Sequence, residues 1–584
     1  MLAGAGGAAL AGTAGCLDGL RAGVERDAPE QISVTIKTFP ADENRICIQI
    51  ARHLAQNMER AGMSVDIQPT TADQLFRDIL VNRDYEMYVA QHPGHFDPDY
   101  LYAFLHSRFI EEPGWQNPLG YANVALVDHQ LEEQRRLAGD DRQAVLDELQ
   151  RAIAETVPFA TVAFPDKARA TAEERFTGWG GYSLGDPLGY ITIEPRSDQM
   201  SEPTTVHVGT VDTRITRNLN PFSVEFRSRG VLVDLLYDSL GRVIDGSIVP
   251  WLAESWSWDQ SGPRTQSLFV RLRDDLRWHD GTELTASDAV FTYRFIRDST
   301  MQPEDPIVPV PRFRGRSTLY DSVWRVDDRT VEIRFDDEIS REVALSMLTV
   351  PVIPENEWAD KSELTEIIGF DLDNVTEALI WDNLEPVGSG PLQIETVETD
   401  EQLVLERFPN HFLQGSIDGG PLSAFEGQPR YDRIAFDLYP SESAIVEMIA
   451  AGELDATADG LSNDGMVRAG RASGVSLRIN PSTAHYHVGF NNRVNPLNNP
   501  RFRKSVSRLI DREYVVTEIF NRYAMPSFSP IKVGGRVPSD LEWEPEHELG
   551  YIGGNGDGLV HEERARDLFR DAGYLYRDDR LLQQ

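Results

Sequence analysis

Strand and helix patterns alternate through residues 31–200, and this alternation constrains the fold more than any other feature of the sequence. An apolar strand near residue 34 leads to an amphipathic helix over residues 44–61, which Gly62 ends. Further strands are predicted at SVDIQP, YEMYVAQ and FATVAF, and further helices over residues 71–82 and 129–156. Strands that alternate with helices favour a largely parallel sheet, so we predict an α/β fold.

The remaining sequence carries more strand signal and then returns to α/β. A new strand begins at TTVHVGTV, and helices are predicted over residues 501–521 and 562–572, the second of which ends at Gly573. Because 584 residues exceed what one hydrophobic core usually organises, we expect at least two lobes.

The charge of the chain excludes several classes of partner. The formal net charge is −38, which argues against binding to a nucleic-acid backbone or to an anionic membrane surface. The acidic residues are spread evenly, whereas lysine occurs only as Lys37, Lys167, Lys361, Lys504 and Lys532. This pattern is typical of proteins from high-salt environments, where ions screen the repulsion. An ordinary acidic protein from a GC-rich genome is the alternative.

The two cysteines have different surroundings, and they are too few for a disulfide framework. Cys47 lies in an apolar run and is predicted to be a buried thiol. Residues 2–15 are small and apolar and directly precede Cys16, which resembles a lipobox whose cysteine is lipidated. Residues 17–30 would then form the tether, and we expect a start codon further upstream that supplies the missing basic segment. A structureless Ala/Gly tail is the alternative.

Four stretches resemble the dipeptide/oligopeptide/nickel family of extracellular solute-binding proteins. They are WLAESW with LRDDLRWHDGTELTASDAVFTYR, GSGPLQIETVETDEQLVLERFPNHF, RYDRIAFDLYPSESAIVEMIAAGELDAT and VGFNNRVNPLNNPRFRKSVSRLIDREYVV. The resemblance implies a two-lobed periplasmic-binding-protein-like fold of class II with an extra subdomain in lobe 1. It also implies a binding protein without enzymatic activity, cofactor or bound metal, which serves the permease and ATPase of an ABC importer.

Residues 31–200 are similar to the segments that close the family's usual sequence, yet here they come first. We therefore predict a circular permutation, with fused or partial gene copies as the alternative. Residues 1–30 would be signal and tether, 31–159 part of lobe 2, 160–200 the return to lobe 1, 201–480 lobe 1 and its subdomain, and 481–584 the rest of lobe 2. A cut in an exposed loop leaves a packed core intact.

The resemblance places solute-binding candidates on both sides of the interlobe cleft. They are Asn220, Phe222, Val224, Glu225, Phe226, Arg227, His92, Gly94, His95, Asp97, Asn491 and Asn492. Peptide-binding members carry an aspartate where this chain has Gly94, which weakens the case for a peptide. His92 and His95 keep a metal chelate open as ligand, because imidazoles suit nickel and copper, although this spacing is more often structural. A sugar is a further alternative.

Two other functions compete with the importer. The Gly181-Tyr182-Ser183-Leu184-Gly185 pattern fits a hydrolase nucleophile elbow, which needs a strand before the serine and a helix after it. We predict a strand at GYITIEP instead, so a secreted hydrolase that uses Ser183 is the weaker hypothesis. A surface sensor that shares the fold is not separable from an importer subunit by sequence.

Overall fold

The structure is a computed structural model of the chain. It describes residues 30–196, 203–223, 232–259, 266–335, 339–365, 375–417, 419–532, 537–544, 547, 549–553 and 556–583.

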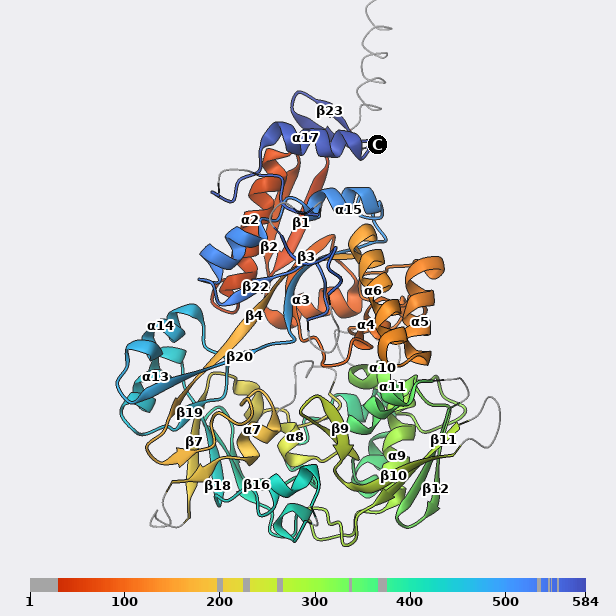
Figure 1. Cartoon of the computed structure of the whole chain (residues 1–584), viewed down its shortest axis with the longest axis vertical. Coiled ribbons are helices and arrows are strands. Elements are labelled where there is room, and N and C mark those ends of the chain that lie inside the picture. The colour runs from red at the N-terminus through yellow and green to blue at the C-terminus, as the bar shows by residue number, and fades with distance from the viewer. Residues whose placement is uncertain are drawn as a thin grey trace, which may run out of the picture.

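One twelve-stranded mixed sheet runs through both lobes of the molecule (Figure 1). Its central path has the order β16-β17-β18-β7-β19-β4-β21-β3-β1-β2, and β20 and β22 pair with β4 outside that path. We call the half that contains β1, β2 and β3 lobe 2, and the half that contains β7, β16, β17 and β18 lobe 1. The α/β prediction is confirmed, but the sheet is mixed rather than largely parallel.

The N-terminal part of lobe 2 folds as its sequence pattern predicts. Its parallel strands are β1 (Ser33–Thr38), β2 (Ser64–Pro69) and β3 (Met87–His92). Helix α2 (Arg45–Arg60) connects β1 to β2, and the side chain of Asn44 caps it by accepting the N–H of Cys47. Gly62, which follows the helix, has a φ of +91°, a conformation that glycine adopts without strain.

The other helices of lobe 2 come from both ends of the chain. They are α3 (Ala72–Arg77), α4 (Tyr100–Leu105), α5 (His129–Arg136), α6 (Gly139–Thr156), α15 (Pro500–Ser507), α16 (Arg512–Tyr514) and α17 (Glu562–Asp571). The single helix predicted over residues 501–521 is wrong. Asp511 has a non-helical φ of −79° and ψ of 92°, and its side chain accepts the N–H of Tyr514, so it starts a new helix after α15.

Lobe 1 combines the other end of the long sheet with a separate subdomain. Its strands in the long sheet are β7 (Thr205–Thr210), β16 (Leu392–Glu398), β17 (Gln402–Arg407), β18 (Arg433–Leu438) and β19 (Ala456–Thr457). The subdomain sheet has the order β10 (Ala253–Asp259), β11 (Gln266–Leu272), β13 (Thr330–Phe335), β12 (Ser322–Asp327). Helix α9 (Ala286–Arg297) belongs to this subdomain and begins with a capping box formed by Thr285 and Asp288.

Shorter elements complete both halves. The strands are β5 (Phe176–Thr177), β6 (Glu194–Pro195), β8 (Gly241–Ile244), β9 (Ser247–Pro250), β14 (Leu364–Thr365), β15 (Val375–Thr376), β22 (Ala524–Pro526), β23 (Leu575–Arg577) and β24 (Arg580–Leu582). The helices are α7 (Pro187–Ile191), α8 (Val233–Leu236), α10 (Arg314–Ser317), α11 (Arg341–Leu345), α12 (Glu355–Trp358), α13 (Glu442–Ala450) and α14 (Asn463–Arg471).

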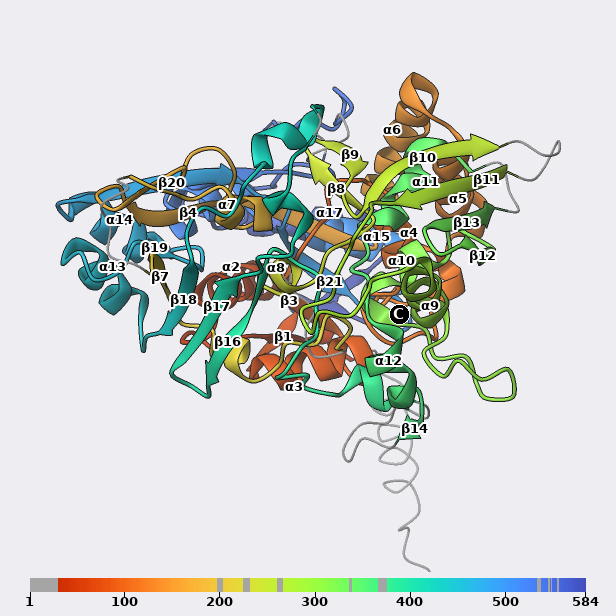
Figure 2. The same ribbon diagram turned by 90° about the horizontal axis from the view of Figure 1, so that it is seen from below.

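Two strand connections join the lobes. Strand β4 (Phe159–Ala172) pairs with β21 (His485–Phe490) in lobe 2 and, at its other end, with β20 (Val475–Pro481). The chain passes from β20 directly into β21, so the two connections cross side by side (Figure 1). Figure 2 shows the same arrangement from below. Two extended crossings of this kind suit a hinge between lobes.

The described ends of the chain lie next to each other in lobe 2. The N–H of Ile32 donates to the carbonyl of Leu581, and the N–H of Gln583 donates to the carbonyl of Glu30. The core of lobe 2 accordingly mixes residues 32–163 with residues 486–581, whereas the core of lobe 1 comes from residues 176–456. The circular permutation and the exact segment boundaries stay predictions.

No helix in the described part of the chain combines the length and apolar character needed to cross a membrane. Cys47 is fully buried, and burial raises the pKa of its thiol, as expected of a core cysteine.

Candidate functional site

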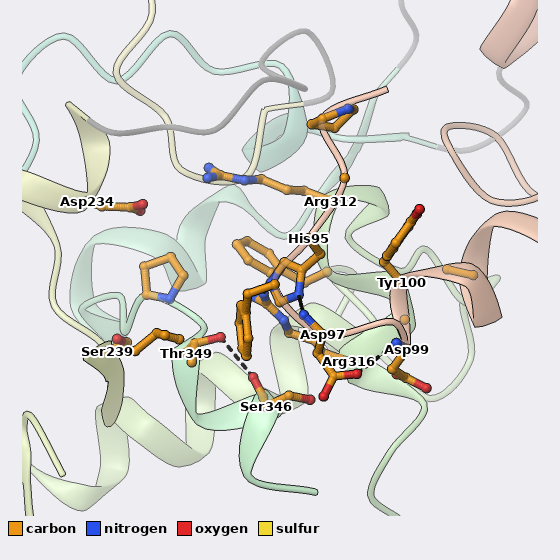
Figure 3. Close-up of a pocket in the computed structure, with 18 of the residues that line it drawn as sticks. His95, Asp97, Asp99, Tyr100, Asp234, Ser239, Arg312, Arg316, Ser346 and Thr349 are labelled. Atoms are coloured by element: carbon orange, nitrogen blue, oxygen red, sulfur yellow. Dashed lines mark hydrogen bonds between the residues drawn. The ribbon is translucent and has the colours of Figure 1, made fainter. Parts of the chain in front are cut away.

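A cavity of about 410 Å³ lies between the two lobes (Figure 3). The wall from lobe 2 consists of the segment after β3 and of helix α4, joined by Trp115 and Gln116. The wall from lobe 1 consists of segments near α7, α8, β8 and α10, together with residues 346–351. Because both lobes contribute, any change in their separation changes the shape of this space.

The lobe 2 wall is rich in aromatic side chains. His92, Gly94, His95 and Asp97, four of the sequence candidates, line the cavity there. The aromatic side chains of the same wall are Phe96, Tyr100, Phe104 and Trp115. Broad apolar faces with few polar groups are typical of walls that cover a small bound molecule.

The two carboxylates of the lobe 2 wall are already neutralised. Asp97 accepts from Arg142 at 2.6 and 3.1 Å, and Asp99 accepts from Arg135 at 2.6 and 2.8 Å. All four side chains are buried. Bidentate pairs of this kind satisfy both charges, so Asp97 lines the cavity without offering a free carboxylate.

On the lobe 1 wall, the described residues Asp234, Arg312 and Arg316 carry charged side chains that face the cavity (Figure 3), and Asp186 and Arg242 also line it. Within the described residues no hydrogen bond or ion pair engages the carboxylate of Asp234, and no ion pair joins it to either arginine. Arg312 donates to the carbonyl of Pro221 at 2.8 Å. The lobe 1 wall therefore presents charges that protein carboxylates and guanidinium groups do not neutralise.

Burial shifts the pKa of each of these three groups toward its neutral form. It raises the pKa of Asp234, an effect that Arg312 and Arg242 oppose. It lowers the pKa of Arg312, and it lowers the pKa of Arg316 to about 10, with the nearby positive charge of Arg312 adding to the second shift. Two neighbouring guanidinium groups repel each other, so the space beside them favours an anion.

Several contacts cross the cleft and hold the lobes together in the structure. Arg316 donates to Nε2 of His95 at 2.5 Å, and Gln116 donates to the carbonyl of Pro311. Arg314 binds Glu112 with two hydrogen bonds of 2.6 and 2.9 Å. These pairs link lobe 1 to lobe 2 around the cavity, so the structure corresponds to a closed arrangement.

His92 of the lobe 2 wall packs against two further histidines, His485 and His487, that do not line the cavity. The ring of His92 lies 5.3 Å from that of His485 and 6.3 Å from that of His487, and the last two are 5.7 Å apart. Burial lowers the pKa of all three, to about 3 for His485. Among the described residues no group of three or more His, Cys, Asp or Glu side chains is arranged to hold a metal ion.

The remaining sequence candidates lie away from the cavity or outside the described residues. Asn220 is buried and donates to the carbonyls of Ala378 and Trp381, so it fixes a loop. Phe222 is buried in the core of lobe 1. Asn491 and Asn492 are occupied by backbone carbonyls inside lobe 2. Cys16, Val224, Glu225, Phe226 and Arg227 lie outside the described residues.

Ser183 lies in a tight local turn. Its hydroxyl accepts the N–H of Gly185 at 3.1 Å. The strand predicted at GYITIEP is wrong, because Asp186 caps helix α7 by accepting the N–H of Leu188 and Pro187 occupies the first helical turn. This helix has five residues, and Ser183 precedes its cap, so the serine does not take the place of a nucleophile on an elbow.

The backbone at Gly94 disfavours an aspartate at this position. Gly94 has a φ of +62°, and a Cβ atom there would overlap the carbonyl of Thr483. We expect Gly94→Asp to destabilise the protein by about 2 kcal/mol through backbone strain. It should also fail to raise the affinity for peptides. Urea denaturation and a titration with a dipeptide check both outcomes; an unchanged midpoint with tighter binding would contradict this account.

The family model described as "Bacterial extracellular solute-binding proteins, family 5 Middle" matches residues 247–583, which is more than half of the chain. Among curated proteins, the peptidoglycan-binding protein YepA of Agrobacterium fabrum is 26% identical over 43% of this chain and 37% of its own length. The periplasmic oligopeptide-binding protein OppA of Escherichia coli is 22% identical over 61% of both chains. The chain thus spans less than two thirds of these relatives.

Some solved structures are similar to this chain at low identity. A periplasmic oligopeptide-binding protein of an oligopeptide ABC transporter from Thermotoga maritima, bound to mannohexaose, is 21% identical with a TM-score of 0.43. The alignment covers 65% of this chain and 64% of that one. NikZ from Campylobacter jejuni in complex with Ni(L-His) is 17% identical with a TM-score of 0.44, over 66% of both chains.

Sequence reasoning missed Asp234, Arg312 and Arg316, the three charged residues of the lobe 1 wall. Arg312, Arg314 and Arg316 stand within five residues of one another, in a chain with 56 basic and 94 acidic residues. That local concentration of arginine was the available signal. Asp234 belongs to no motif, and only the fold places it at the cavity.

Proposed function

This chain belongs to the bacterial extracellular solute-binding proteins of family 5, and on that premise we propose that it captures a small solute for an ABC importer. The observation that carries the proposal is the interlobe cavity, whose walls come from both lobes and whose charges on one wall are left without protein partners. Family relatives are binding proteins, so the chain binds its solute reversibly and does not transform it.

The partners follow from this role. The protein works outside the membrane and delivers its solute to the permease, while the ATPase acts on the other side. Cys16, if lipidated, tethers the chain to the membrane surface. A single lipid chain binds the membrane only marginally and reversibly. A stable anchor at Cys16 would therefore need more than one lipid chain.

The solute is small. Cavities of roughly 300–1,000 Å³ hold drug-sized ligands, and the space here of about 410 Å³ lies near the lower end of that range. A dipeptide or a short oligopeptide is the favoured class. A metal chelate or a sugar is the alternative, since Gly94 replaces the aspartate that peptide-binding members carry.

A thermal-melt screen of the full-length chain in molar salt tests the proposal. The panel contains dipeptides, amino acids, a neutral trisaccharide and nickel–histidine, each at millimolar concentration. A bound solute at about a hundred times its dissociation constant should stabilise the folded state by roughly 2.7 kcal/mol, which gives a clear rise in Tm. A flat response to every class would contradict a solute-capturing role.

A further inference from the structure

Among the described residues, the cavity-lining charges without an ion-pair partner lie on the lobe 1 wall. Asp234 comes from helix α8, and Arg312 and Arg316 lie 78 and 82 positions further along the chain, Arg312 in the turn before α10 and Arg316 within α10. Figure 3 shows Asp234 and Arg312 pointing into the cavity from opposite sides. Of the other charged residues of the walls, Arg242 binds Asp238, and Asp97 and Asp99 hold arginines. The carboxylate of Asp186, also on the lobe 1 wall, has no ion-pair partner among the described residues but accepts the N–H of Leu188 as the cap of α7.

These charges are costly in a closed cavity unless a ligand compensates them. A buried charge without a partner is strongly disfavoured, because it loses hydration and gains nothing in return. Asp234 lacks a cationic partner among the described residues, and the two guanidinium groups lack an anionic one. Asp234, whose carboxylate no hydrogen bond among the described residues engages, and the two neighbouring guanidinium groups are therefore the charges left for the solute.

We propose that the solute is a small zwitterion, with its ammonium group bound by Asp234 and its carboxylate bound by Arg312 and Arg316. This inference rests on the proposed function and assigns the anchors of that same site. A carboxylate suits the arginine side because guanidinium groups bind carboxylates with charge-assisted hydrogen bonds, often in pairs. An ammonium suits Asp234 because its three donors satisfy an otherwise unpaired carboxylate.

Lobe 2 closes over the zwitterion without adding a free charge. Its aromatic side chains contact the apolar part of the solute, and Asp97 and Asp99 stay neutralised by their arginines. His95 accepts a hydrogen bond from Arg316 and so fixes the position of that guanidinium group when the two lobes close. The solute consequently binds to lobe 1 through its charges, and lobe 2 covers it afterwards.

Chemically blocked ligands test the anchors on the unmodified protein. Alanyl-phenylalanine is titrated against the full-length chain by calorimetry, together with its N-acetylated form, its C-amidated form and the neutral trisaccharide maltotriose. Loss of a hydrogen-bonded charge weakens binding by about tenfold or more. We expect each blocked form to bind at least tenfold more weakly than the free dipeptide.

Variants that remove one charge each assign the two ends of the solute. In Asp234→Asn the tenfold preference for the free amine over the N-acetylated form should disappear. In Arg312→Gln the preference for the free carboxylate over the amide should shrink in the same way. Asp400→Asn and Arg217→Gln are the matched controls, because they change the same charges in a surface pair away from the cavity and should keep both preferences.

The outcomes separate this inference from the proposed function. Binding of the free dipeptide that depends on both charged ends, and on Asp234 and Arg312, supports it. Tight binding of maltotriose, or binding of both blocked dipeptides as tight as that of the free dipeptide, unchanged in Asp234→Asn, overturns the zwitterion and leaves the solute receptor standing. No binding by any member of the panel overturns both. Circular dichroism of each variant confirms that it is folded.

Discussion

Asp238→Ala is expected to destabilise the protein by about 3–5 kcal/mol, the range found when one partner of a buried ion pair is removed. Asp238 is fully buried, and it accepts from Nε1 of Trp251 at 2.6 Å and bonds to Nε2 of His411 at 2.8 Å. Arg242 donates to the same carboxylate at 3.3 Å. Alanine would leave a guanidinium group and an imidazole without their partner inside the core of lobe 1.

Urea denaturation at neutral pH measures this loss. The matched control is Asp400→Ala, which breaks an exposed pair with Arg217 and should cost no more than about 1 kcal/mol. Equal midpoints for the two variants would show that Asp238 does not organise lobe 1. The network matters for the family resemblance as well, because Trp251 and His411 belong to two separate stretches that carry it.

Acidification is expected to destabilise the protein through its histidine cluster. Burial lowers the pKa of His92, His485 and His487 in the folded state, whereas an unfolded histidine titrates near its ordinary value of about 6.5. The unfolded chain therefore binds more protons as the pH falls below 6.5, and unfolding becomes easier. Each such histidine costs about 1.4 kcal/mol per pH unit, or about 6 kcal/mol for three at pH 5.

Free energies of unfolding between pH 8 and pH 5 check this expectation. His485→Phe should flatten the decline by about 1.4 kcal/mol per pH unit, because a phenylalanine has no proton to bind. At pH 8 the histidine is neutral in both states, so the same variant measured there reports its packing effect alone. An acid-induced decline with the same slope in His485→Phe would show that this cluster is not responsible.

Local sequence signals predicted most of lobe 2, because its elements are specified by neighbours in the chain. The helix between Asn44 and Gly62 has a cap, an apolar face and a glycine end, and the structure places it within a residue of the prediction. The prediction of a single helix over residues 501–521 was wrong. In the sequence Asp511 looks like one more polar helical residue, but in the structure its side chain accepts the N–H of Tyr514 and starts a new helix.

The sequence likewise gave no indication that the sheet is mixed. Strands β1, β2 and β3 are parallel, as the alternation with helices indicates, but β21 enters between β3 and β4 from almost four hundred residues away. Antiparallel neighbours of that kind depend on long-range topology and leave no local pattern.

The candidate site was only partly visible. His92, Gly94, His95 and Asp97 line the cavity because they follow a buried strand, where ligand sites commonly lie in open α/β sheets. The engagement of Asp97 by Arg142 was not visible, because 45 positions separate the two residues. Asp234 and Arg312 meet at the cavity for the same reason, through tertiary structure alone.

Small-angle X-ray scattering of the full-length chain, with and without a solute that raises Tm, tests the central claim most directly. If the solute binds between the lobes and the hinge strands β4 and β20 allow closure, the radius of gyration and the maximum dimension should both decrease on saturation. Tight binding that leaves both values unchanged would contradict capture by closure of the two lobes.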